Sequence, residues 1–140
     1  MLNSNSKSFE LTLRIDWSEL DLFGHVNNTN YFKYTQSNRL IILDYLSLNE
    51  LHRNTGVGPT LGNTQCRFIK SLMYPGNVRV NSTIKSIGNS SFVIEHDLYN
   101  DDNTLCAQAE DVIVVFDYNK ECKVLIPNDV RIKLEELCKG

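Results

Sequence analysis

A strict alternation of apolar and polar residues runs along the chain from residue 9 to residue 17. The apolar members of this run are Phe9, Leu11, Leu13, Ile15 and Trp17. Successive side chains of a β-strand point to opposite faces of a sheet. The period of two therefore predicts a strand with one buried face and one solvated face.

A longer period replaces this alternation after a loop expected over residues 18–27. Asn27 and the two residues after it are good N-cap candidates for a helix. Mostly apolar residues then recur every three or four positions, namely Tyr31, Tyr34, Thr35, Asn38, Ile41, Ile42, Tyr45 and Leu46. This spacing predicts a long helix with one broad buried face that ends near Leu46. Residues 47–59 are expected to form a connection with one short helical turn.

The remainder of the chain returns to strand-like patterns. Four further strands are predicted, over residues 60–69, 78–85, 92–99 and 105–118. Gly88-Asn89 and the polar stretch 100–103 mark turns between the last three of these strands. Pro127 and Asn128 are expected to begin a short C-terminal helix.

This order of elements predicts one α+β domain that spans residues 1–140, with residues 1–8 flexible. The expected architecture is a long central helix wrapped by a five-stranded antiparallel sheet. A single curved sheet covers only one side of such a helix. Its outer face or its edge is therefore expected to need another subunit, which predicts an oligomer.

Composition narrows the function classes. The 140 residues are 41% hydrophobic and 22% charged, a balance typical of a globular domain. The net charge of −3 gives no sign of a basic face, so nucleic acid is not expected as a partner. No apolar stretch is long enough for a membrane span or a signal peptide, so a cytoplasmic protein without a membrane partner is expected.

Four cysteines occur without metal-binding or redox spacing. Cys66, Cys106, Cys122 and Cys138 form no C-x-x-C pair and have no matching histidines. They are expected to be reduced thiols, two of them acting as small apolar residues in strands.

The residues between the first strand and the long helix carry the chemistry. Asp21, Gly24, His25, Asn27 and Asn28 lie close together in sequence there. The first turn of a helix presents unpaired N–H groups and the positive end of the helix dipole, which can stabilise an oxyanion. A nearby carboxylate can attack a carbonyl or activate a water molecule, and glycine permits a tight turn and close approach of a ligand. Nothing in this arrangement requires a metal or another cofactor.

Each of these residues taken alone has an ordinary structural explanation. Asp21 can form an Asx-turn, Asn27 and Asn28 can cap the helix, and His25 can be a core or capping residue. Glu19 is expected to be solvated. The residue types alone leave the catalytic and the structural interpretations open.

The run E-L-D-L-F-G-H-V-N-N at residues 19–28, followed by Tyr31 and Arg39, resembles the signature of the 4-hydroxybenzoyl-CoA thioesterase-like hotdog family, which includes the YbgC and FadM types. That family's pattern is close to D-x-D-x-x-G-H-V-N-N-x-x-Y. Further similar stretches follow in order at residues 67–70, 74–78, 87–92 and 107–116. The resemblance implies a hotdog fold and covers roughly residues 11–130. Glu19 departs from the family's first acidic residue, and Ser71 stands where proline is expected.

The resemblance implies roles at the reaction centre. Asp21 matches the nucleophile or general base, and Asn28 matches the residue whose N–H completes the oxyanion hole. His25 matches the histidine near the thioester. Gly24, Asn27 and Tyr31 are expected at the substrate site, with Tyr31 lining the acyl pocket.

The resemblance also implies an active site between two subunits of a homodimer or homotetramer. Ser90 and Ser91 are expected to lie beside the pantetheine arm. Arg67, Lys70 and Lys85 are candidates for the CoA phosphates.

The function implied is hydrolysis of a small or fatty acyl-CoA thioester, or of an acyl-carrier-protein thioester. One alternative is a module that binds such an acyl group without turning it over. A hotdog hydratase or dehydratase is a weaker alternative, because those proteins place a histidine five residues after the catalytic aspartate, whereas Asp21 and His25 are four apart.

Overall fold

The computed structural model describes residues 7–138 of the 140-residue chain. The helices are α1 (Asn28–Tyr45), α2 (Leu48–Thr55) and α3 (Asn128–Cys138). The strands are β1 (Ser8–Arg14), β2 (Val57–Phe68), β3 (Asn77–Ile87), β4 (Ser91–Tyr99), β5 (Leu105–Asp117) and β6 (Cys122–Lys123). Most of the stretch expected to be flexible, residues 1–6, lies outside the described residues.

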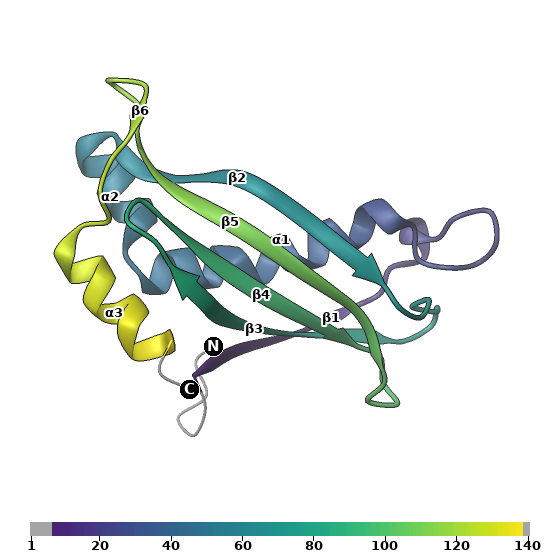
Figure 1. The fold of residues 1–140 in the computed structure, drawn as a ribbon. Helices are drawn as coiled ribbons and strands as arrows, with labels where there is room; N and C mark the ends of the chain where they lie inside the picture. Colours follow the sequence, from purple (N-terminus) through teal and green to yellow (C-terminus); the bar gives the residue numbers. More distant parts are fainter. Residues whose placement is uncertain (1–6, 139–140) are drawn as a thin grey trace.

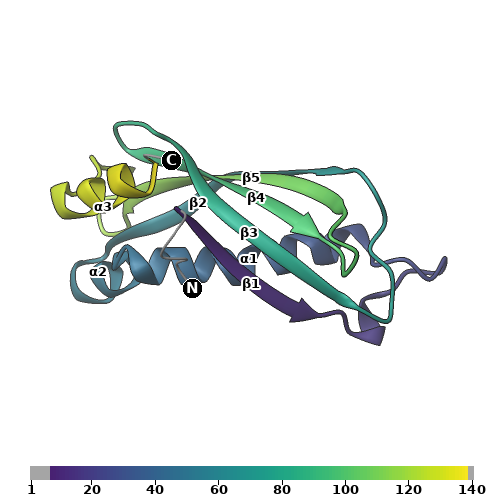
Figure 2. The same cartoon turned by 90° about the horizontal axis from the view of Figure 1, so that it is seen from below.

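The strands form one antiparallel sheet in the order β1-β3-β4-β5-β2, with β6 paired to β5. Helix α1 runs along one face of this curved sheet (Figures 1 and 2). Helix α3 lies at the end of the sheet opposite the loop between β1 and α1. The predicted α+β architecture, a long helix wrapped by an antiparallel sheet, is confirmed.

The first strand is shorter than predicted. Strand β1 ends at Arg14, and the Asp16 carboxylate then accepts a hydrogen bond from the Ser18 N–H (3.0 Å) and caps a short 3-10 helix, Trp17–Glu19. Trp17 is 72% exposed instead of buried. The capping side chain ends the extended backbone before the alternating pattern ends.

The connection after α1 and the number of strands also differ from expectation. The connection contains an eight-residue helix, α2, and β2 already starts at Val57, so Pro59 lies inside a strand. Proline is tolerated there because β2 is an edge strand. The sheet has six strands instead of five, because the Asp117 carboxylate accepts hydrogen bonds from the N–H groups of Asn119 (2.9 Å) and Lys120 (3.0 Å) in a turn that folds β6 back onto β5. A two-residue strand is too short to show an alternating pattern.

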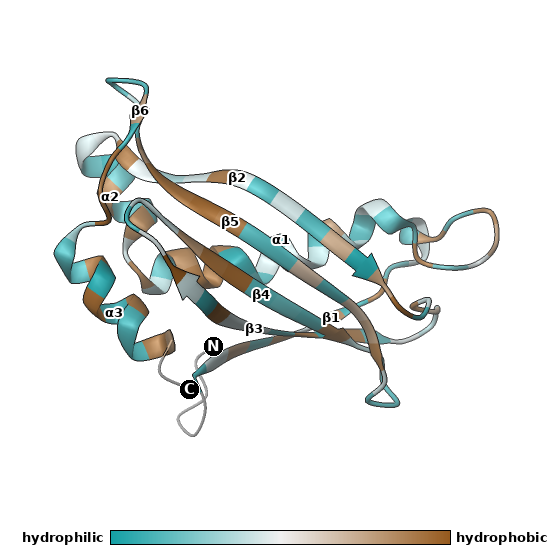
Figure 3. Cartoon of the chain, viewed as in Figure 1, coloured by the Kyte–Doolittle hydropathy of each residue, from teal (hydrophilic) through white to brown (hydrophobic). Residues whose placement is uncertain are grey.

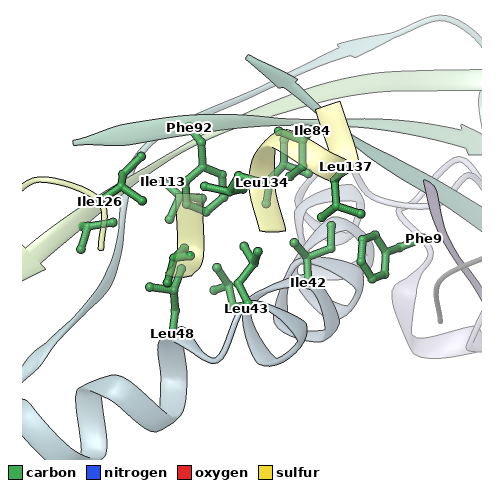
Figure 4. Close-up of a cluster of buried hydrophobic side chains, with 14 residues drawn as sticks. Phe9, Ile42, Leu43, Leu48, Ile84, Phe92, Ile113, Ile126, Leu134 and Leu137 are labelled. Carbon is green, nitrogen blue, oxygen red and sulfur yellow. The ribbon is translucent and has the colours of Figure 1, made fainter. Parts of the chain in front are cut away.

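The apolar core consists of two clusters. The first joins α1, α3 and the sheet, and Figure 4 shows its side chains converging, among them Ile42 of α1, Leu134 of α3 and Phe92 of β4. The second cluster lies nearer the loop between β1 and α1. Its buried members are Ile15, Val26, Tyr31, Tyr34, Leu72, Val78, Val80, Leu98, Cys106 and Ala107.

A row of buried polar side chains separates the two clusters. Each of α1, β3, β4 and β5 contributes a residue to this row where members of one cluster give way to members of the other. The four residues of this polar row are Asn38, Ser82, His96 and Asp111, and all are 0% exposed. Asn38 Nδ2 donates to Ser82 Oγ (2.6 Å), Ser82 Oγ lies 2.6 Å from His96 Nδ1, and His96 Nε2 lies 2.7 Å from Asp111 Oδ2. These hydrogen bonds offset the burial of the four polar groups, and Asn38 Oδ1 is the one buried side-chain atom among the described residues without a partner.

The hydrogen bonds around Asp111 keep its carboxylate charged. Its Oδ2 lies within hydrogen-bonding distance of His96 Nε2. Asp111 also accepts from Arg39 (3.0 Å) and from Thr64 (2.7 Å). Burial alone would raise the pKa of Asp111, but these partners outweigh burial and lower the pKa. Ser82 is fully buried, so this Ser-His-Asp chain is structural and offers no nucleophile to a substrate.

The substitution Asp111→Asn is expected to destabilise the fold by about 2–3 kcal/mol, because the neutral amide leaves the largely buried Arg39 guanidinium without its opposite charge. The folded-state pKa of Asp111 lies below its ordinary value of 3.8. Its contribution is therefore present above about pH 4 and is lost as the pH falls through the folded pKa. Urea unfolding of both proteins at several pH values measures this difference.

The exposed-face substitution Asp97→Asn is the matched control, because Asp97 accepts one hydrogen bond, from Gln108, outside the core. It should change stability by no more than about 0.5 kcal/mol. A difference between the wild type and Asp111→Asn that stays constant on acidification would contradict the role given to the Asp111 charge.

Candidate functional site

The loop between β1 and α1 is a tight hairpin. Leu20 and Val26 form an antiparallel bridge, and the Asp21 N–H donates to the His25 carbonyl (2.7 Å). Gly24 has a φ of +78°, in the left-handed region that favours glycine. Apart from the glycine and its two chain neighbours, no described residue has an atom within 4 Å of the place its Cβ would occupy. Gly24 therefore serves the turn and leaves open space beside it.

The two oxygens of the Asp21 carboxylate have different surroundings. Oδ1 accepts hydrogen bonds from the N–H groups of Phe23 (2.8 Å) and His25 (3.1 Å). This is the Asx-turn that the sequence offered as the structural alternative. Oδ2 accepts no hydrogen bond from residues 7–138, so the turn orients the carboxylate while one oxygen stays available to a ligand.

The first turn of α1 has one unused N–H group. Asn27 is the N-cap, since its Oδ1 accepts from the Thr29 N–H (3.1 Å) and its carbonyl accepts from the Asn30 N–H (2.9 Å). The Asn28 N–H has no acceptor within the part of the chain that the structure describes. It lies at the positive end of the helix dipole and is free to bind an anion.

Glu19 is buried, and the prediction that it is solvated is wrong. It is 5% exposed, and its Oε1 accepts from the Asp16 N–H (2.8 Å) and the Tyr34 hydroxyl (2.7 Å). Its Oε2 accepts from Lys33 Nζ (2.8 Å). Tyr34 and Lys33 lie on α1, so the Glu19 carboxylate lies between this helix and the short 3-10 helix. This tertiary contact cannot be predicted from the local sequence pattern.

The free groups of Asp21 and Asn28 belong to one pocket, with a volume of about 180 Å³. Its lining residues are Asp21, His25, Val26, Asn28, Tyr31, Phe68, Ile69, Lys70 and Ser71. The Tyr31 hydroxyl accepts from the Leu72 N–H (3.0 Å), and its ring packs edge-on against Phe68 with 4.9 Å between ring centroids. Burial raises the pKa of Tyr31, so its hydroxyl stays protonated at neutral pH.

The sequence predicted one side of this pocket and missed most of the other. Asp21, His25, Asn28 and Tyr31 come together as expected, but Phe68, Ile69 and Ser71 were not expected to line it. The sequence marks this segment only through the resemblance of residues 67–70 to a second stretch of the hotdog family. The backbone contact that brings it to the site is a hydrogen bond from the Val26 N–H to the Leu72 carbonyl (3.0 Å).

The candidates for CoA contacts lie in three places. Lys70 lines the pocket with Asp21. Arg67 is hydrogen-bonded to Gln108 on the outer face of the sheet, and Lys85 forms ion pairs with two glutamates on that face. Ser90 and Ser91 lie at the start of β4, where Ser91 pairs with Val114, whereas the pocket lies where β2 ends and β5 begins. Within one chain, only Lys70 of these five lies at the pocket.

Residues 7–138 contain no group of three or more His, Cys, Asp or Glu side chains able to hold a metal ion. The four cysteines are free thiols. Burial, with a smaller effect from the Asp111 charge, raises the pKa of Cys66 to about 11, so this thiol is unreactive at neutral pH.

A family model described as the thioesterase-like superfamily matches residues 15–134 of the chain. This chain belongs to the thioesterase-like superfamily. The match contains the hairpin, the start of α1 and the segment from Phe68 to Ser71, so all the residues that line the pocket lie within the family region.

Solved thioesterases share the fold. A predicted thioesterase from Bacillus stearothermophilus is 26% identical, with a TM-score of 0.84 over 92% of this chain and 95% of that one. The DHNA-CoA thioesterase from Staphylococcus aureus is 14% identical, with a TM-score of 0.82 over 93% of this chain and 92% of that one. The hotdog architecture inferred from the sequence is thereby confirmed.

A curated relative of this superfamily member is protein YsmA of Bacillus subtilis (strain 168). It is 26% identical over 91 residues, which are 65% of this chain. The match spans 60% of that relative's length. Among the helices of residues 7–138, none has the length and apolar character needed to cross a bilayer.

Proposed function

We propose that the chain hydrolyses an acyl-CoA thioester, with Asp21 as the catalytic carboxylate and the Asn28 N–H as the oxyanion donor. The observation that carries this proposal is a single pocket holding one unpaired carboxylate oxygen and one unpaired helix N–H. Membership of the thioesterase-like superfamily supports the reaction class. The DHNA-CoA thioesterase, which shares the fold, is named for a CoA thioester, and this supports a CoA thioester as the substrate here.

The reaction begins with the thioester carbonyl oxygen at the Asn28 N–H, where the helix dipole favours the negative charge that develops on attack. Asp21 Oδ2 either takes a proton from an attacking water or attacks the carbonyl carbon itself to form a mixed anhydride that water then cleaves. Both routes break the carbon–sulfur bond and yield the free acid and CoA thiol. The CoA thiolate is a good leaving group and needs little acid assistance. His25 borders the same pocket, which supports a contact between its side chain and the thioester.

Ser90, Ser91, Arg67 and Lys85 do not lie at the pocket within one chain, so we assign them to a substrate site that two subunits share. Strand β2 pairs only with β5, and no strand in the described part of the chain covers its other edge. Phe68 at its end is 44% exposed. The tip of the hairpin between β1 and α1 is brown in Figure 3, and its Leu22 and Phe23 are 100% and 83% exposed. A second copy would cover these groups and would bring its own Ser90, Ser91 or basic residues to the CoA arm. Light scattering of the protein in solution tests whether a homodimer or homotetramer forms.

Thiol release from acyl-CoAs with short, medium, long and aromatic acyl groups tests the reaction. We expect turnover of at least one of them, and the rates rank the acyl groups. Tight acyl-CoA binding without thiol release would favour the binding module. Turnover only of an acyl-carrier-protein thioester would change the substrate and keep the chemistry.

A further inference from the structure

Glu19 lies next to the site and is buried and ionised, but it takes no part in the proposed reaction. Burial by itself would raise its pKa, but the hydrogen bonds from Lys33, from the Asp16 N–H and from Tyr34 outweigh burial and lower the pKa. The carboxylate is therefore charged, and all three of these partners donate to it at 2.7–2.8 Å. Lys33 has a side chain that is 64% exposed, so the two donors held by the fold are the Asp16 N–H and the buried Tyr34 hydroxyl.

The main chain of Glu19 holds the start of α1. Its carbonyl accepts hydrogen bonds from the Asn27 N–H (2.8 Å) and from Asn30 Nδ2 (3.1 Å). Asn27 is the N-cap and immediately precedes Asn28. In the other direction along the chain, Glu19 is two residues before Asp21 and adjoins the bridge that closes the hairpin.

We infer that Glu19 is a positioning residue that sets the separation between the Asp21 carboxylate and the Asn28 N–H; this inference rests on the proposed function. Its side chain is fixed to the 3-10 helix and to α1, and its carbonyl is fixed to the helix N-cap. A shift of Glu19 therefore moves the two reacting groups relative to each other. Both groups must fit the same tetrahedral intermediate, and an error of about 1 Å in such an arrangement can cost about 100-fold in rate.

Two substitutions separate positioning from a purely structural role. Glu19→Gln keeps an oxygen for the Asp16 N–H and the Tyr34 hydroxyl, while Lys33 can turn to solvent. Glu19→Leu removes both acceptors at nearly constant volume. For Glu19→Leu we expect kcat to fall by about 10- to 100-fold, with KM within about twofold of the wild type. Glu19→Gln should restore most of kcat.

The matched controls are Glu110→Leu and Glu110→Gln, because Glu110 also pairs with a lysine, Lys85, but on the outer face of the sheet. Neither control should change kcat. All variants are measured well below their unfolding temperatures and beside the wild type and Asp21→Asn. If Glu19→Leu lowers the unfolding temperature but keeps the wild-type kcat, Glu19 is only structural and the inference is overturned while the proposed function stands.

Amide hydrogen exchange gives a readout that does not depend on activity. The Asn27 N–H donates to the Glu19 carbonyl, so its exchange should accelerate in Glu19→Leu and stay close to wild type in Glu19→Gln. A wild type with no thioesterase activity would contradict the proposed function, and the exchange rates would still decide whether Glu19 fixes the helix start. Unchanged Asn27 exchange in Glu19→Leu would overturn the inference.

Discussion

Asp21→Asn should lower kcat for acyl-CoA hydrolysis by about 10²–10⁴-fold while leaving the fold intact. The asparagine Oδ1 can still accept from the N–H groups of Phe23 and His25, so the hairpin keeps its Asx-turn. The free oxygen, however, is replaced by an amide NH₂, which neither takes a proton from water nor attacks a carbonyl. Steady-state thiol release, with the unfolding temperature as a check on folding, measures the effect.

Asp102→Asn is the matched control for this prediction. Asp102 is an exposed residue in the turn between β4 and β5 and does not line the pocket, so the same chemical change there should leave kcat unaltered. If Asp21→Asn retains wild-type turnover, the catalytic assignment is wrong and the free oxygen is a consequence of the turn alone.

Asn28→Pro should lower kcat by about 10²–10³-fold, because it removes the one N–H group that the proposal assigns to the oxyanion. Position 28 is the first residue of α1, where proline is well tolerated because its missing N–H has no partner within the helix. The preceding residue, Asn27, has φ −62° and ψ 139°, a conformation compatible with a following proline. The substitution therefore deletes a single donor with little disturbance of the helix.

Asn28→Ala separates the backbone from the side chain at this position. It keeps the N–H and removes only the carboxamide, which makes no hydrogen bond with residues 7–138, so kcat should stay within a few-fold of the wild type. Equal losses in the alanine and proline variants would place the effect in the side chain and contradict the assignment of the backbone donor. Circular dichroism of both variants verifies that α1 is retained.

The sequence predicted the elements whose burial follows a regular period. Strands β3, β4 and β5 alternate because one face meets the core, and α1 was found from its apolar spacing and its cap at Asn27. Strand β6 and the length of α2 were missed, since they depend on a local turn and on packing at a sheet edge. Trp17 was misplaced because a capping carboxylate overrides the alternation.

The candidate site was predictable to the extent that it is local in the chain. Asp21, His25, Asn28 and Tyr31 lie within eleven residues, so a hairpin and one helical turn suffice to gather them. The opposite wall comes from residues 68–71, and its position depends on long-range backbone pairing. No single-sequence pattern encodes such pairing.

The buried polar row shows the same limit. His96 stood in the apolar phase of its strand, between Ile94 and Leu98, and that exception was visible in the sequence. The partners of His96 could not be identified from the sequence, because Ser82 and Asp111 come next to it only through the pairing register of β3, β4 and β5. Polar residues in an apolar phase therefore predict that a network exists, and the structure is needed to name its members.

The polar row also bears on how this sequence can diverge over evolutionary time. It partitions the interior into an α3 half, which contributes stability, and a hairpin half, which borders the pocket. Ile42, Phe92 and Leu134 pack in one cluster, so we expect a change at one of them to be compensated by a change at another. We therefore expect the α3 half of the interior to vary in evolution without disturbing the half that supports the pocket, and the polar row to vary least.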